Sequence, residues 1–144
     1  MLTGRCLCGD CRYTISRSPR RMYYCHCSRC RRNTGSSFST AAIVNRSDFS
    51  VIEGQDLLSS FESSEGVWRY FCSRCGSPLY GSYERSPETL WISSGTLDED
   101  PLVRPSFHRN VGDRAPWVEI TDDLEKFEGD LGPEDLQRLY FSNP

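Results

Sequence analysis

The sequence has no apolar run that approaches the ~20 residues a membrane-spanning helix requires. Its first ten residues, MLTGRCLCGD, lack the basic segment followed by an apolar segment that marks a secretory signal. The chain also has no low-complexity linker and no internal repeat. We therefore expect a cytoplasmic protein that binds no membrane. At 144 residues we expect one domain, spanning residues 1–144.

Lysine is almost absent, since Lys126 is the only one against sixteen arginines. Residues 1–50 carry nine arginines and two acidic residues, a net charge of +7, whereas the remainder carries eight basic and eighteen acidic residues, a net charge of −10. The arginines of the basic half lie among cysteines, without the interleaved aromatic residues of a single-strand binder. We expect no nucleic-acid partner, and interpret this half as compensation for a thiolate cluster and a candidate cradle for a small anion.

Helical patterns are also scarce, and most of the chain reads as short strands broken by Gly, Pro, Ser and Asn or Asp. The expected strands are residues 11–16, 21–27, 37–45, 49–54, 57–63, 67–72, 77–83 and 89–95. One helix is expected in GPEDLQRLYF, where Pro133 suits the first turn and Leu136, Leu139 and Tyr140 form an i, i+3, i+4 stripe. Residues 105–117 are too rich in Pro, Gly and charge to be regular. The pattern predicts a mainly β domain with a short C-terminal helix.

Eight cysteines are present, which is many for a chain expected in the reducing cytosol, where metal binding is a commoner role than disulfides. Their spacing defines three groups: CLCGDC (Cys6, Cys8, Cys11), CHCSRC (Cys25, Cys27, Cys30) and CSRC (Cys72, Cys75).

The third group is one half of a zinc site, since C-x2-C followed by Gly76 makes a tight turn that directs two sulfurs at one metal. On extended backbone, Cys6 and Cys8 face the same side and can supply a second pair. We expect these four cysteines, Cys6, Cys8, Cys72 and Cys75, to form a closed structural zinc site. The alternative is that they are buried reduced thiols. Cys11 is expected in the core rather than as a ligand.

The middle group supplies three sulfurs and no obvious fourth ligand. Cys25 and Cys27 face one way on a strand, a turn returns Cys30, and His26 points to the opposite face, so we do not expect it to bind the metal. Catalytic zinc sites keep one position for water or substrate. The spacing therefore predicts an open zinc site, with Cys25, Cys27 and Cys30 as the catalytic centre.

Arginines follow this group directly. Arg29, Arg31 and Arg32 would offset the charge of a three-thiolate zinc and favour the anionic form of an incoming thiol. Arg31 and Arg32 are our candidates for binding substrate carboxylates. The next residues, NTGSS at 33–37, form either an anion-binding nest or a structural cap.

At this point the sequence resembles a known family. The segments GRCLCGDCRY, CHCSRCRRNTGSSF, FCSRCGSPLY, GTLDED, PSFHRN and APWVEI, from Gly4 to Phe127, are similar to the glutathione-dependent formaldehyde-activating enzymes, which include the centromere-protein-V-type domain. The resemblance implies a β-tent of antiparallel sheets and two zinc ions. It places Cys6, Cys8, Cys72 and Cys75 in the structural site and Cys25, Cys27 and Cys30 in the open one. Cys11 departs from the family pattern, which usually has an aliphatic residue there.

The resemblance also implies an activity: a carbon–sulfur lyase, S-(hydroxymethyl)glutathione synthase-like, whose partners are a small thiol such as glutathione and an aldehyde such as formaldehyde. His108, at a family motif position, is a candidate substrate-binding residue and proton carrier. We expect Trp117 to be a core anchor rather than a substrate platform. Two alternatives remain open, a non-catalytic zinc-stabilised binding module and a thiol redox protein that uses Cys11 or a metal-free Cys30. The oligomeric state cannot be predicted.

Overall fold

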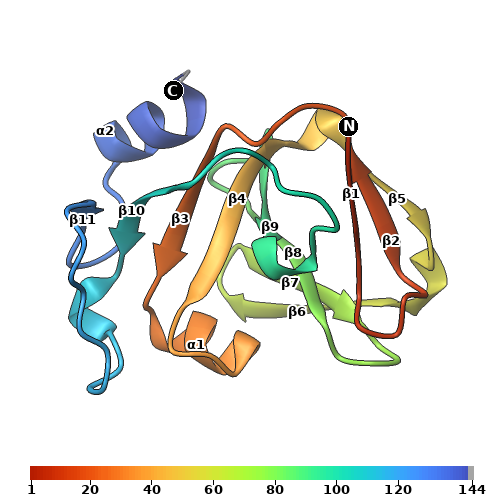
Figure 1. Ribbon diagram of the computed structural model, residues 1–144, viewed down its shortest axis with the longest axis horizontal. Coiled ribbons are helices and arrows are strands. Elements are labelled where there is room, and N and C mark those ends of the chain that lie inside the picture. Colours follow the sequence, from red (N-terminus) through yellow and green to blue (C-terminus); the bar gives the residue numbers. More distant parts are fainter. Residues whose placement is uncertain (143–144) are drawn as a thin grey trace.

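The computed structural model describes residues 1–142, and its strands form two sheets (Figure 1). The small sheet has the order β1-β2-β5 and the large sheet the order β11-β10-β3-β4-β9-β8-β7-β6. The strand bounds are β1 Leu2–Arg5, β2 Arg12–Ile15, β3 Arg21–Cys25, β4 Ser39–Asn45, β5 Phe49–Glu53, β6 Leu58–Ser64, β7 Val67–Cys72, β8 Pro78–Tyr83, β9 Thr89–Ser93, β10 Pro105–Arg109 and β11 Glu125–Lys126. The mainly β prediction is confirmed.

Helical segments are short. They are α1 Ser28–Thr34, α2 Pro133–Leu136 with a π-helical continuation over Gln137–Phe141, and 3-10 turns at Arg46–Asp48, Gln55–Leu57, Ser94–Thr96 and Val111–Asp113. Within residues 1–142 no helix has both the length and the apolar character that crossing a membrane would need.

All eight expected strands are present, but the prediction that residues 105–117 are irregular is wrong at its start. Residues 105–109 form β10, which runs parallel to both β3 and β11, whereas the other strand pairs are antiparallel. Pro105 is the first residue of the strand, where a missing N–H is tolerated. Phe107 is fully buried, so packing against β3 outweighs local composition.

The central strand β4 explains how the core is divided. Its residues Ala41 to Val44 are all buried, because both faces of the large sheet are covered there. Ala42 and Val44 pack into the cluster shared with the small sheet, whereas Ala41 and Ile43 pack into the cluster shared with the C-terminal segment. This alternation follows the two-residue period of a strand.

The C-terminal segment covers the second face, above β3 and β10 in Figure 1. The predicted helix begins at Pro133, and its stripe of Leu136, Leu139 and Tyr140 is buried, as the spacing indicated. Trp117, by contrast, is 72% exposed, so its predicted place in the core is wrong. Its indole Nε1 donates to Oγ of Ser37 at 2.8 Å, and the loop that carries it lies outside both core clusters.

Candidate metal centres

Four sulfurs from two distant segments meet between the sheets. The Sγ atoms of Cys6, Cys8, Cys72 and Cys75 all lie within 4.8 Å of one another. Sγ of Cys8 is 3.5 Å from that of Cys6 and 3.9 Å from that of Cys72. Four thiolates bound at about 2.3 Å around a tetrahedral zinc would be about 3.8 Å apart. The four residues therefore fit a closed tetrahedral metal site.

Each half of this cluster is a tight turn closed by a glycine with positive φ. The amide of Gly76, at φ 78°, donates to the carbonyl of Cys72 at 2.7 Å. The amide of Gly9, at φ 84°, donates to the carbonyl of Cys6 at 3.1 Å. The expectation that Cys6 and Cys8 lie on extended backbone is wrong, since β1 ends before them, yet the turn brings the sulfurs together equally well.

The second cluster forms where β3 ends and α1 begins. Cys25 is the last residue of β3, Cys27 caps the N-terminus of α1, and Cys30 lies in its first turn. The amide of Cys30 donates to Sγ of Cys27 at 3.3 Å, and the three Sγ atoms lie within 4.8 Å of one another. The predicted simple turn is thus a helix, but the expected convergence of three sulfurs holds.

A pocket of about 220 Å³ opens on these three sulfurs. Besides the cysteines, it is lined by Arg29, Ser64, Val67, Arg69, Tyr83, Arg109, Asn110 and Asp130. Asn110, at φ 56°, places Oδ1 3.6 Å from Sγ of Cys25. Three sulfurs facing a cavity correspond to a site with one position left for a ligand.

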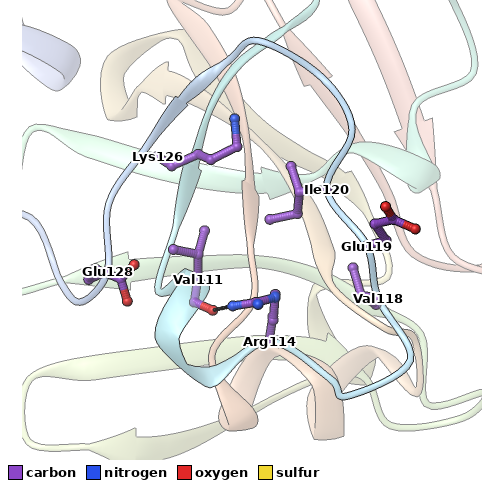
Figure 2. A pocket seen from close by; sticks show the side chains of 7 residues that line it. All are labelled: Val111, Arg114, Val118, Glu119, Ile120, Lys126 and Glu128. Carbon is purple, nitrogen blue, oxygen red and sulfur yellow. Dashed lines mark hydrogen bonds between the residues drawn. The ribbon is translucent and has the colours of Figure 1, made fainter.

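Volume alone would not identify this pocket. Figure 2 shows a larger hollow, of about 370 Å³, which includes Val118 and Ile120 and contains no cysteine. The two cationic side chains at its wall already donate hydrogen bonds to backbone carbonyls. Arg114 donates to Val111, and Lys126 donates to Asp122 and Leu124. The convergence of metal-binding donors therefore singles out the thiol pocket.

Arg69, which the sequence did not single out, places a cation beside Cys30. Its Nη2 and Nη1 atoms lie 3.7 Å and 3.8 Å from Sγ of Cys30. Its Nε donates to Oγ of Ser63, and its guanidinium lies over the ring of Trp91. Hydrogen bonds from Cys25 and Cys27, together with the charge of Arg69, lower the pKa of Cys30.

Arg109 forms another wall of the pocket and is itself 2% exposed. The rings of Tyr23, Tyr83 and Tyr140 surround its guanidinium at 5.5 to 6.0 Å. Nη2 pairs with Asp130, and Nη1 donates to the hydroxyl of Tyr140 at 2.7 Å. Its Nε is buried without a hydrogen-bond partner among the described residues. Arg109 therefore ties the C-terminal segment to the site.

The three substrate-binding candidates from the sequence lie elsewhere. Arg31 and Arg32 are not among the residues that line the thiol pocket, whereas Arg29 is. His108 is 4% exposed, and its ring contacts His26 and Asp122. That these three bind substrate stays a prediction.

His26 and Cys11, which we did not expect to be metal ligands, belong to neither sulfur cluster. His26 is fully buried, and its ring bonds to His108 instead of joining the sulfur cluster. Cys11 is 1% exposed in the core cluster, with Sγ donating to the carbonyl of Gly54 at 3.5 Å. The strand positions assumed for both residues were wrong, since β3 ends at Cys25 and β2 begins at Arg12.

Comparisons with known proteins agree with this arrangement. The family profile described as glutathione-dependent formaldehyde-activating enzyme matches residues 1–113. A Halomonas elongata protein, named provisionally as such an enzyme, is 31% identical over 128 residues, which cover 83% of this chain and 81% of that protein. Proteins with the same provisional name from Podospora anserina and Aspergillus flavus are 32% and 30% identical. The matches cover 58% and 79% of this chain but only 40% and 54% of those longer proteins.

Among solved structures, a crystal structure of a Rhodobacter sphaeroides protein superposes with a TM-score of 0.59 at 25% identity. The match covers 68% of this chain and 89% of that one. The family profile spans both cysteine clusters and most of the residues that line the thiol pocket. The chain belongs to the glutathione-dependent formaldehyde-activating enzyme family.

Proposed function

We propose that the protein is a zinc-dependent carbon–sulfur lyase that forms or cleaves the S-hydroxymethyl adduct of a small thiol, with glutathione and formaldehyde as the substrates. The observation that carries this proposal is the three-cysteine cluster, whose sulfurs face a cationic pocket instead of a fourth protein ligand. Family membership supports the choice of substrates. We place the reaction in the cytoplasm, whose thiol pool is reduced.

Zinc suits both clusters, because thiolates are soft ligands and both sulfur sets have the spacing of a tetrahedral ion. We propose two ions per chain, a structural one held by Cys6, Cys8, Cys72 and Cys75 and a catalytic one held by Cys25, Cys27 and Cys30. Zinc in an open site supplies a Lewis acid that favours the thiolate form of an incoming thiol.

The protein's own residues then set the charge of the pocket. Three thiolates and one divalent ion leave a net charge of −1, which Arg69 offsets from within hydrogen-bonding distance of Cys30. Arg29 adds a second cation at the wall, and Arg109 is neutralised by Asp130. We assign Arg29 and Arg69, ahead of Arg31 and Arg32, to the attraction of the thiolate and carboxylates of the substrate.

The reaction needs no oxidant or reductant. In the synthetic direction the thiol sulfur forms a bond to the carbonyl carbon of formaldehyde, the carbon–oxygen π bond opens, and the proton lost by the thiol ends on the new hydroxyl oxygen. Thiol plus aldehyde equals the hydroxymethyl thioether in atoms and charge. The contribution of the pocket is a high thiolate fraction and a fixed position for the sulfur.

Exchange spectroscopy tests this proposal. Magnetisation transfer between ¹³C-formaldehyde hydrate and its glutathione adduct reports their interconversion at equilibrium. Zinc-loaded protein is expected to speed it above the protein-free rate, and Cys27→Ser to abolish the gain. Cys11→Ala, which removes a thiol outside both clusters, is the matched control and should keep it. No acceleration by the wild type, with thiol binding intact, would contradict the enzyme assignment and favour the binding module.

A further inference from the structure

The chain has two histidines, and they are hydrogen-bonded to each other in the interior. Nε2 of His26 lies 2.8 Å from Nδ1 of His108, and Nε2 of His108 lies 2.9 Å from Oδ2 of Asp122. His26 is fully buried and His108 is 4% exposed, whereas the side chain of Asp122 is 43% exposed. A continuous polar chain therefore runs from a surface carboxylate to the residue between two of the clustered cysteines.

His26 is restrained at both its backbone and its ring. Its amide donates to the carbonyl of Arg109 at 3.0 Å, and its ring packs on Phe38 with a centroid distance of 5.2 Å. Cys25, before it, forms the last ladder pair of β3 with β10, opposite Arg109, and Cys27, after it, lies beyond the end of the strand. Fixing His26 therefore fixes the backbone that directs both neighbouring sulfurs toward the pocket.

The far end of the chain is fixed as well. Asp122 accepts from the amide of Leu124 at 3.0 Å, and Lys126 donates to its backbone carbonyl at 3.0 Å. The loop that holds it also carries Val118, Glu119 and Ile120, the residues at the right of the hollow in Figure 2. The carboxylate is thus presented to His108 by a turn of its own.

The hydrogen bonds of this chain run in one direction, with His26 donating to His108 and His108 donating to Asp122. A carboxylate only accepts, so Nε2 of His108 carries a hydrogen and, in the neutral ring, its Nδ1 accepts from Nε2–H of His26. The other ring nitrogen of His26, Nδ1, is buried without a partner among the described residues. In the neutral ring it carries no hydrogen, because the hydrogen is on Nε2. Apolar side chains would pack here without the cost of desolvating two imidazoles, so the fold alone does not require them.

We propose that Asp122, acting through His108 and His26, is a positioning residue for the three-cysteine site, holding Cys25 and Cys27 so that their sulfurs stay at ligand spacing. Metal retention at that site then depends on a carboxylate that contacts neither the metal nor the substrate. The proposal rests on the metal occupancy proposed above. Partners in the shell around metal ligands typically change metal affinity 10- to 100-fold.

The test measures zinc affinity at the two sites of one chain by competition with a chromophoric chelator. The variants are Asp122→Asn, which keeps the size of the side chain but removes its charge, and His108→Phe. Asp123→Asn, at the neighbouring exposed carboxylate, is the matched control. The four-cysteine site is the internal reference, since a variant that simply unfolds would lose both ions. Cobalt substitution adds a spectroscopic measurement, because the thiolate-to-cobalt absorption at the three-cysteine site reports the geometry of its sulfurs.

We expect Asp122→Asn and His108→Phe to weaken zinc binding at the three-cysteine site 10- to 100-fold and to change the spectrum of cobalt bound there. Zinc affinity at the four-cysteine site should be unaffected. Asp122→Glu should recover part of the loss. Equal affinities in wild type and Asp122→Asn would overturn the positioning role, as would parallel weakening at both sites. A wild type that takes up one ion only, at the four-cysteine site, would instead overturn the proposed function on which the inference rests.

Discussion

The guanidinium of Arg69, on β7, lies 3.7 Å from Sγ of Cys30, on α1. The two residues are 39 positions apart in the chain, and both are largely buried. The pair joins β7, which lies between β6 and β8 in the large sheet, to the helix that presents the sulfurs. It also places a permanent cation where a three-thiolate site has surplus negative charge, and the predictions for ligand binding begin there.

Arg69→Gln is expected to weaken glutathione binding by about 10- to 100-fold. A hydrogen bond to a charged group is worth about 1.5–3 kcal/mol, and about 1.4 kcal/mol corresponds to tenfold in Kd. Isothermal titration into zinc-loaded protein measures the effect. Arg69→Lys keeps the charge and should recover part of it.

Arg31→Gln and Arg32→Gln are the matched controls for that substitution, since neither residue lines the thiol pocket. They should bind glutathione within about twofold of wild type, because neither guanidinium contributes to the wall of the pocket. Suppose instead that these two variants lost glutathione binding while Arg69→Gln retained it. Arg31 and Arg32 would then bind the substrate, as the sequence predicted, and the role assigned to Arg69 would be wrong.

The two metal ions are expected to differ in lability. The four-cysteine site is closed by ligands from two turns, one after β1 and one at the end of β7, whereas the three-cysteine site faces a cavity. A chelator should therefore remove one equivalent quickly with the fold retained, and the second only with unfolding. Elemental analysis together with circular dichroism follows both steps.

Serine variants separate the same two sites. Cys27→Ser should fold with one zinc per chain, while Cys72→Ser should lose the fold, because removal of a structural ligand breaks the link between the sheets. A Cys72→Ser protein with native stability would show that this cluster is not a structural metal site.

Tyr13 gives a pH dependence that does not involve the cysteines. Burial raises its pKa from 10.0 to about 12, against the opposing effect of its hydrogen bond with Thr96. The fold therefore favours the neutral phenol, so the stabilisation is complete below pH 10 and is lost as the pH rises through 12.

Between pH 9 and 11 this ionisation should lower the free energy of unfolding by about 1.4 kcal/mol. Tyr13→Phe should show a decline smaller by that amount, measured by urea unfolding at both pH values. The comparison uses the slope with pH, since the lost hydrogen bond lowers stability at every pH. Identical slopes would show that Tyr13 does not couple to alkaline unfolding.

Gly81→Ala tests the packing beneath Arg69. A Cβ at this position would lie 1.9 Å from Cζ2 of Trp91, and the Trp91 ring lies under the guanidinium of Arg69. Overpacking of this kind costs about 1–3 kcal/mol and would displace the ring. Thermal unfolding and glutathione titration should both show a loss. In the control, Gly95→Ala, the new Cβ would meet nothing within 4 Å, and no loss is expected.

Both cysteine clusters could be predicted from the sequence because ligand spacing is a local property. The CSRC turn closed by Gly76 and the CHCSRC group each carry their geometry within a few residues. We predicted that Cys6 and Cys8 pair with the CSRC turn because we expected them on a strand, but β1 ends before them and they lie in a turn. Two sulfurs separated by one residue converge in either conformation, so the ligand set was right and its backbone was wrong.

The pocket could not be predicted, because its residues depend on long-range pairing. Arg69 reaches Cys30 only through the order of the large sheet, and Asp130 arrives from the C-terminal segment. The choice of Arg31 and Arg32 rested on their position next to the cysteines in the sequence, and only a simple turn was expected there. Since those residues form a helix, each position rotates by about 100°, and Arg29 faces the pocket instead. The sequence did hold one indication of Arg69. The segment VWRYFC was expected to be a strand, and Arg69 is a buried residue of that strand.

The most direct measurement of the central claim is calorimetric titration of glutathione into protein with a measured zinc content, for wild type and Cys27→Ser. Cysteine and S-methylglutathione serve as comparison ligands, the second lacking a free thiol. The account predicts two zinc ions per chain and binding of glutathione that disappears in Cys27→Ser and for S-methylglutathione. Absence of glutathione binding in the two-zinc wild type, or undiminished binding by Cys27→Ser, would contradict it.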